Sequence, residues 1–329
     1  MKIIALEEHF ATPGIMAAWT ALAPELQDIS IGKSQGGAIE RRLYDLADER
    51  IQLMIESGVD VQVLSLGTPG VQSLAGEKAV LLARTTNDLL AEMIWKMPDR
   101  FQGFATLPTP SPKDAPRELE RAICQLGLNG AMLYGRTGGK NIDHADFLPI
   151  FETAAALRAP ISLHPQTPLP SVRNTYYSGF EDKFNDLFAG AGIGWHYETG
   201  IQALRLVLSG IFDRLPDLQL ILGHWGEIVL FFLDRIDLMS EGAKLQKPVS
   251  EYFKTNIFVT PSGMFNPRYL AWAVELLGAD RIMFATDYPY QIKENGKSRR
   301  FLEAADLSEQ DRNNIAHANW ERMCAAIRR

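Results

Sequence analysis

Several short apolar segments of this sequence end in side chains that can bind a divalent metal ion. Glu7 and His9 end the first segment, His164 and His224 end two central ones, and Asp287 ends the last. Imidazole and carboxylate ligands suit zinc, manganese or iron, and no thiolate favours a structural zinc site. A single such histidine is more typical of a hydrogen-bonded core residue. Four convergent segment ends predict a site for one divalent ion, Zn²⁺ or Mn²⁺.

The spacing within the first segment supports chelation. Side chains alternate along a strand, so Glu7 and His9 share one face and Glu8 points to the other. We therefore expect Glu7, His9, His164 and Asp287 to surround the ion, with His224 beside them.

The elements that must position these residues alternate between strands and helices. The candidate strands are apolar along their length, as parallel strands covered on both faces are; they are Ile3–Glu8, Val59–Leu66, Gly103–Leu107, Gly130–Tyr134, Ile161–His164, Leu218–His224, Ile257–Thr260 and Ile282–Asp287. Helical periodicity follows each of them, over Leu43–Ser57, Glu77–Lys96, Pro112–Leu126, Asp146–Leu157, Thr199–Arg214, Glu227–Leu238, Pro267–Leu277 and Ser308–Arg328.

Eight strand–helix pairs in series favour a (β/α)₈ TIM barrel, which we expect to occupy residues 1–329 as a single domain. An open doubly wound sheet is the alternative, but no glycine-rich dinucleotide motif follows the first strand. The active site of such a barrel lies at the carboxyl ends of its strands. Two long non-periodic segments, 11–42 and 166–195, follow strands one and five, so we expect them to form long loops on that face.

Composition excludes several other classes. The chain has 329 residues and a net charge of −7, which argues against a nucleic-acid or anionic-membrane partner. No apolar run is long enough for a membrane span. Cys124 and Cys324 have no metal-binding spacing, and we expect them to be buried free thiols in a cytoplasmic protein.

The combination of motifs resembles the amidohydrolase-related, metal-dependent decarboxylases, such as gamma-resorcylate, 2,3-dihydroxybenzoate and 5-carboxyvanillate decarboxylases. The resemblance extends from Leu6 to the C-terminal helix, and the motifs that carry it are Ala5-Leu6-Glu7-Glu8-His9-Phe10, Leu163-His164-Pro165, Ser209-Gly210-Ile211-Phe212-Asp213-Arg214-Leu215-Pro216, Leu222-Gly223-His224-Trp225-Gly226-Glu227 and Thr286-Asp287-Tyr288-Pro289-Tyr290.

This resemblance implies roles for individual residues. Glu7, His9, His164 and Asp287 match the metal ligands of the family, and some members have alanine in place of His9. His224 and Glu227 match a histidine–glutamate pair beside the metal. Arg235 matches an arginine that contacts substrate, although an ion pair with Asp234 or Asp237 is nearly as plausible. Segment 11–42 does not align clearly with any member, and Gln166-Thr167 replaces an Arg-Asn pair that several members carry.

The implied function is non-oxidative decarboxylation of an ortho-hydroxybenzoate, with substrate carboxylate and phenol on the metal. Asp287 is the candidate acid for the ring carbon, and His224, held by Glu227, orients Asp287 or binds a substrate oxygen. Phe10, Trp19, Tyr288 and Tyr290 are candidate contacts for the ring, with core packing as the alternative for each. A metal-dependent hydrolase of a lactone or amide is the runner-up, and a binding protein on a barrel scaffold is a third possibility.

The remaining histidines receive structural interpretations. His144 lies in a polar surface loop, His317 caps or packs in the C-terminal helix, and His196 packs more plausibly than it reacts, near the rim of the pocket. Because relatives are dimers or tetramers, we also expect a homo-oligomer. Phe231 and Phe232 could contribute an apolar contact, although they could equally be the buried face of their helix.

Overall fold

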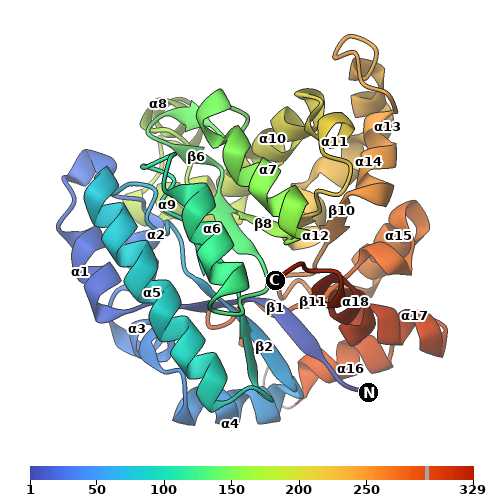
Figure 1. Cartoon of the computed structure of the whole chain (residues 1–329), viewed down its shortest axis with the longest axis horizontal. Helices are drawn as coiled ribbons and strands as arrows, with labels where there is room; N and C mark the ends of the chain where they lie inside the picture. Colours follow the sequence, from blue (N-terminus) through green and yellow to red (C-terminus); the bar gives the residue numbers. More distant parts are fainter. Residues whose placement is uncertain (293–295) are drawn as a thin grey trace.

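The computed structural model describes residues 1–292 and 296–329. Its central feature is a ring of parallel strands with helices around it (Figure 1). The candidate residues lie at the carboxyl ends of these strands. The strands of the ring are β1 (Ile4–Phe10), β2 (Val61–Leu66), β3 (Phe101–Gly103), β4 (Ala105–Thr106), β5 (Ala131–Tyr134), β8 (Ile161–His164), β9 (Leu220–Leu222), β10 (Ile257–Val259) and β11 (Phe284–Ala285).

The ring closes through two junctions. β3 and β4 are one strand interrupted at Phe104, and they pair with β2 and β5 respectively. On the other side Val259 forms a parallel bridge with Ile282, and the Met283 N–H donates to the Val259 carbonyl at 3.0 Å. Each remaining neighbour is a parallel pair in chain order, and β11 returns to β1. The eight-stranded TIM barrel predicted from the sequence is therefore confirmed, and the doubly wound sheet is not formed.

The helices cover the outside of this ring. In chain order they are α1 (Pro13–Thr20), α2 (Ser30–Ser34), α3 (Gly37–Tyr44), α4 (Asp48–Ser57), α5 (Gly76–Lys96), α6 (Ala115–Cys124), α7 (Leu148–Leu157), α8 (Pro170–Val172), α9 (Asp182–Leu187), α10 (Gly194–Leu208), α11 (Ile211–Arg214), α12 (His224–Glu227), α13 (Leu233–Ile236), α14 (Val249–Thr255), α15 (Pro267–Leu277), α16 (Lys297–Glu303), α17 (Glu309–Asn313) and α18 (Asn319–Ala325).

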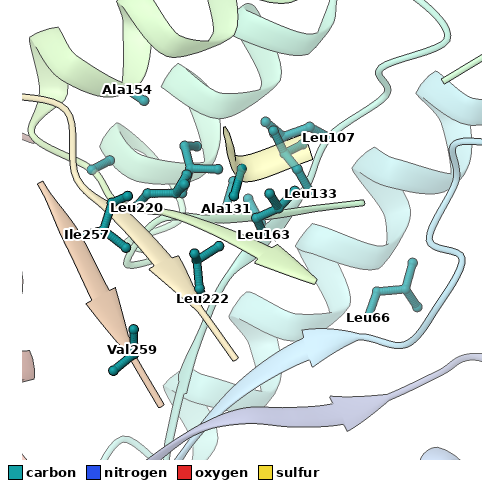
Figure 2. Close-up of a cluster of buried hydrophobic side chains, with 14 of the residues drawn as sticks. Leu66, Leu107, Ala131, Leu133, Ala154, Leu163, Leu220, Leu222, Ile257 and Val259 are labelled. Atoms are coloured by element: carbon teal, nitrogen blue, oxygen red, sulfur yellow. The ribbon is translucent and has the colours of Figure 1, made fainter. Parts of the chain in front are cut away.

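Two cores hold the layers together. The larger one lies between strands and helices, and Figure 2 shows Leu133, Leu163 and Leu220 on neighbouring strands with Ala154 of α7 behind them. The smaller one fills the barrel with the alternate residues of the same strands, among them Leu6, and Trp320 of α18 belongs to it. Apolar side chains on both faces of each strand are what the sequence pattern predicted.

Several boundaries differ from the sequence prediction. The helix predicted over Leu43–Ser57 is two helices, since the Asp45 carboxylate accepts the N–H groups of Ala47 and Arg50 and separates α3 from α4. The helix predicted to start at Glu227 starts only after a left-handed turn, with α13 at Leu233.

The two segments expected as loops contain helices of their own. Segment 11–42 holds α1, α2 and most of α3, and segment 166–195 holds α8 and α9 followed by the start of α10. Both cysteines are free thiols, but the expected burial is wrong for Cys124, which is exposed at the end of α6, and Cys324 is only partly buried. Among the described residues, none of the helices has the length and apolar character needed to cross a membrane.

Candidate active site

Four of the predicted residues meet at the carboxyl end of the barrel. Glu7 and His9 come from β1, His164 is the last residue of β8, and Asp287 follows β11. One ligand atom from each lies within 4.8 Å of every other. The His164 Nε2 atom is 3.3 Å from Glu7 Oε1, and the His9 Nε2 atom is 3.5 Å from Asp287 Oδ1.

Hydrogen bonds behind the two imidazoles aim them at this cluster. The Nδ1 atom of His164 lies 3.0 Å from the Pro165 carbonyl and 2.9 Å from the Thr68 hydroxyl, and the Nδ1 atom of His9 lies 3.2 Å from the Ser65 hydroxyl. Because a carbonyl only accepts, His164 carries its proton on Nδ1 and its Nε2 lone pair faces Glu7. Burial, reinforced by the nearby His164, holds the pKa of His9 well below its ordinary value, so His9 is neutral, as an imidazole must be to bind a metal ion.

The carboxylate of Glu7 is held equally firmly. The Ser262 hydroxyl donates to its Oε2 atom, and the Thr260 hydroxyl lies 3.4 Å from the same oxygen. Burial alone would raise the pKa of Glu7, but the nearby imidazoles of His224 and His164 outweigh burial and lower that pKa, so Glu7 is ionised. A Cβ atom on Gly223 would lie 2.8 Å from Glu7 Oε2, so a side chain there would displace the Glu7 carboxylate.

The cluster fits one divalent cation. Glu7 Oε1 and His9 Nε2 are buried and have no hydrogen-bond partner in the described part of the chain. Buried polar atoms without partners are uncommon, and two of them in one cluster fit a site for a Lewis acid. The donor set of two imidazoles and two carboxylates suits manganese or zinc.

A bulge in β1 directs Glu7 into the site. The register between β1 and β2 shifts between Ala5 and Glu8, and Glu7 has a φ of 61°. Glu8 points away from the cluster, as predicted, and accepts hydrogen bonds from Gln62 and from the N–H and hydroxyl of Thr286. Glu8 therefore ties β1 to β2 and to the residue before Asp287.

Asp287 combines burial with a strained backbone. Its φ is 62°, in the left-handed region that is costly for a residue with a Cβ atom and is found mostly at functional sites. Burial, and then the neighbouring Glu7 carboxylate, raise the pKa of Asp287 well above its ordinary value. A bound cation would act in the opposite direction.

His224 and Glu227 form the predicted pair beside the cluster. The His224 Nδ1 atom is 2.8 Å from Glu227 Oε1 and 3.8 Å from Glu7 Oε1. Residues 224–228 all have positive φ, so they form a left-handed turn that places the two side chains together. Burial disfavours the imidazolium, but Glu227 and Glu7 outweigh it and raise the pKa of His224 to about 10.

Of the aromatic residues predicted to contact substrate, the structure brings only Tyr290 to the cluster. Its ring centroid is 5.8 Å from that of His9, and its hydroxyl is 2.6 Å from the Ser34 hydroxyl of α2. Phe10 and Trp19 are buried in the outer core. The Tyr288 ring packs against Arg50 instead, with its centroid 4.2 Å from the Cζ atom of the guanidinium.

Arg235 also lies apart from the cluster within one chain. It is exposed on α13, and no hydrogen bond or ion pair joins its guanidinium to another described residue. The ion pairs with Asp234 or Asp237 that were the alternative are therefore not formed in the described part of the chain. His144 and His317 lie outside the site, as expected, beside Asp146 and Glu321.

Sequence reasoning missed the residues that orient the ligands. Ser262 and Thr260 follow β10, and Ser65 and Thr68 lie at and beyond the end of β2, two strand ends without acidic residues or histidines. A search for hydroxyl groups at the same strand ends would have found them. His196 was assigned to packing, but its Nδ1 atom is 2.7 Å from Glu227 Oε2.

Comparisons with known proteins agree with this geometry. The sequence model of the amidohydrolase family matches residues 17–323. A gamma-resorcylate decarboxylase from Polaromonas sp. (strain JS666) is 36% identical over 333 residues, which cover 97% of each chain.

Two solved structures are similar along the whole chain. The 5-carboxyvanillate decarboxylase from Sphingomonas paucimobilis is 32% identical with a TM-score of 0.89, covering 98% of this chain and 99% of that one. A dihydroxybenzoic acid decarboxylase from Polaromonas sp. JS666, with bound manganese and the inhibitor 2-nitroresorcinol, is 36% identical with a TM-score of 0.84, covering 98% and 97%.

Proposed function

Since this chain belongs to the amidohydrolase family, we propose that it is a metal-dependent decarboxylase that removes the carboxylate of a hydroxylated aromatic acid. The observation that carries the proposal is the four-residue cluster with two unpartnered buried donor atoms. Relatives that decarboxylate aromatic acids match nearly the whole chain, and one of them holds manganese and a resorcinol inhibitor.

Glu7, His9, His164 and Asp287 would hold one divalent ion, manganese or zinc. When bound, the ion would act as a Lewis acid toward a substrate carboxylate and its neighbouring phenol. Glu7, His9 and His164 are all buried, whereas the Asp287 side chain is 15% exposed, so the cluster has little contact with bulk water.

Asp287 is the proposed proton donor. Its proton bonds to the ring carbon that carries the carboxylate, using an electron pair of the ring. The bond between that carbon and the carboxylate then breaks, its electron pair restores the aromatic ring, and carbon dioxide leaves. Asp287 regains a proton from solvent. A carboxylic acid must be protonated before it can donate, and burial of Asp287 favours its protonated form by raising its pKa, while the bound ion would act against it.

His224 and Glu227 assist from the side of β9. Glu227 is fully buried, and burial would raise its pKa, but His224 and His196 outweigh burial and lower it, so it is ionised. It thereby holds the imidazolium of His224 beside Glu7, where His224 can orient Asp287 or donate to a substrate oxygen. We retain Tyr290 as the aromatic contact to the substrate ring. A substrate contact by Phe10, Tyr288 or Arg235 has no support from the geometry of one chain.

Three broader features belong to the same proposal: residues 1–329 act as one catalytic domain, the protein is cytoplasmic, and it forms a homodimer or homotetramer. The free thiols are compatible with a reducing compartment. The exposed rings of Phe231 and Phe232 support self-association.

The test is a substrate panel with manganese-loaded and zinc-loaded protein. We expect carbon dioxide from benzoates with an ortho hydroxyl, such as 2,6-dihydroxybenzoate, and none from 3,5-dihydroxybenzoate, which cannot chelate through a neighbouring phenol. Turnover of lactones or amides without carbon dioxide release would instead establish the hydrolase alternative.

A further inference from the structure

His196 lies outside the metal cluster but is tied to it through Glu227. Both oxygens of Glu227 are engaged, Oε1 by His224 Nδ1 at 2.8 Å and Oε2 by His196 Nδ1 at 2.7 Å. The ring centroids of His196 and His224 are 4.5 Å apart. The carboxylate is thus clamped between two imidazoles that come from different elements, α10 and α12.

A second hydrogen bond fixes the tautomer of His196. The indole Nε1–H of Trp195 donates to His196 Nε2 at 3.1 Å. Because an indole nitrogen only donates, Nε2 must accept, and the proton of a neutral His196 therefore lies on Nδ1. In this tautomer His196 donates a hydrogen bond to the Glu227 carboxylate and leaves it ionised.

The backbone of α10 is shaped for this contact. A Cβ atom on Gly200, one turn after His196, would lie 2.6 Å from the Glu227 carbonyl oxygen. The absence of a side chain at Gly200 lets α10 approach the left-handed turn closely enough for His196 to reach Glu227. The side chains of His196 and His224 are only 12% and 9% exposed, so water competes weakly for the carboxylate.

We propose that His196 is a positioning residue of the reaction: locked as the Nδ1–H tautomer by Trp195, it orients Glu227 and through it His224. The inference rests on the proposed function for its catalytic consequence, but the hydrogen-bond chain itself can be observed without turnover. Loss of an outer hydrogen-bond partner of this kind typically costs about 10–100-fold in activity.

The first test compares two substitutions of His196. In His196→Asn the amide nitrogen occupies the place of Nδ1 and can still donate to Glu227, whereas His196→Leu has similar volume and no donor. We expect kcat of His196→Leu to fall about 10–100-fold with little change in KM, and His196→Asn to stay within about 5-fold of the unaltered protein. Equal kcat in both variants, or equal losses that follow the loss of thermal stability, would overturn the positioning role.

The second test reads the chain directly by proton and nitrogen NMR of the histidine side chains in the manganese-free, zinc-loaded protein. We expect two slowly exchanging Nδ1–H signals, one lost in His196→Asn and both shifted in Glu227→Gln. A protonated Nε2 on His196 would contradict the proposal. Failure of the proposed function is distinguished, because it would abolish decarboxylation in the unaltered protein and leave these signals in place. Binding of a second ion to His196, His224 and Glu227, at two metals per chain, would also overturn it.

Discussion

At the scale of single residues, ligation and proton transfer can be separated experimentally. In His164→Ala the cluster loses an imidazole that is held by Thr68 and Pro165, so we expect metal content after dialysis to fall by at least about 10-fold. His144→Ala removes an exposed histidine and is the matched control, with unchanged metal content. Full metal content in His164→Ala, measured by elemental analysis, would remove His164 from the ligand set.

Asp287→Asn tests the other duty of that residue. An amide keeps an oxygen for the ion but has no acidic proton, so we expect metal to stay bound while kcat falls by about 10²–10⁴-fold, the usual contribution of a general acid. Elemental analysis and decarboxylation assays on the same preparation check both. A variant that keeps both metal and activity would show that another group delivers the proton.

The four-residue cluster could be predicted from the sequence because histidine and acidic residues stand at the ends of several strands of one barrel, as His164 and Asp287 show. The groups that orient them could not, because a serine such as Ser262 or a histidine such as His196 is unremarkable until its partner is placed beside it. Tyr288 was a candidate substrate contact because it follows Asp287 in the sequence. Its ring packs against the buried Arg50 instead, and the sequence does not reveal that partner.

At the scale of elements, Arg50 of α4 braces the first strand. Its guanidinium is fully buried and donates to the His9 carbonyl at 2.6 Å, to Gln62 at 3.0 Å and to the Asp45 carbonyl at 2.8 Å. Each buried acceptor left without a donor costs about 1–3 kcal/mol, so we expect Arg50→Met to lower the free energy of unfolding by at least about 2 kcal/mol.

Urea unfolding of the chelator-treated protein measures this effect without a contribution from the metal. Arg84→Met is the control, since that side chain is 53% exposed and 3.6 Å from Glu118, and we expect a change within about 0.5 kcal/mol. Equal stability of Arg50→Met and the unaltered protein would mean that the brace contributes nothing.

The strands were predictable because each is a short apolar run with both faces buried, such as β8. The short helices were not, because their sequences lack the period of an exposed helix. In α1 the residues Ile15, Met16, Ala18 and Trp19 are all buried, so no polar stripe marks the helix. The left-handed turn after β9 could not be predicted either, because the residue types there do not reveal that the φ angles are positive.

At the scale of the whole molecule, the apolar run after the left-handed turn divides between core and surface. Leu230 and Leu233 are buried, whereas Phe231 is 73% and Phe232 47% exposed. The ring centroids of Phe231 and Trp272 are 6.0 Å apart. Exposed aromatic rings in contact with one another are typical of protein interfaces.

Phe231→Glu therefore tests self-association. We expect the unaltered protein to elute as a dimer or tetramer and the variant to shift to a smaller species in light scattering. Leu81→Glu, at a leucine of α5 that is 62% exposed, is the control and should leave the mass unchanged. A monomeric unaltered protein would contradict the expected assembly.

The most direct test of the central claim is the decarboxylation of 2,6-dihydroxybenzoate by the metal-loaded protein in deuterium oxide, followed by NMR. We expect release of carbon dioxide together with a resorcinol that carries one deuteron at the vacated ring carbon, and no reaction after metal removal by chelator. Unchanged acid with fully metal-loaded protein, or turnover that is indifferent to the metal, would contradict it.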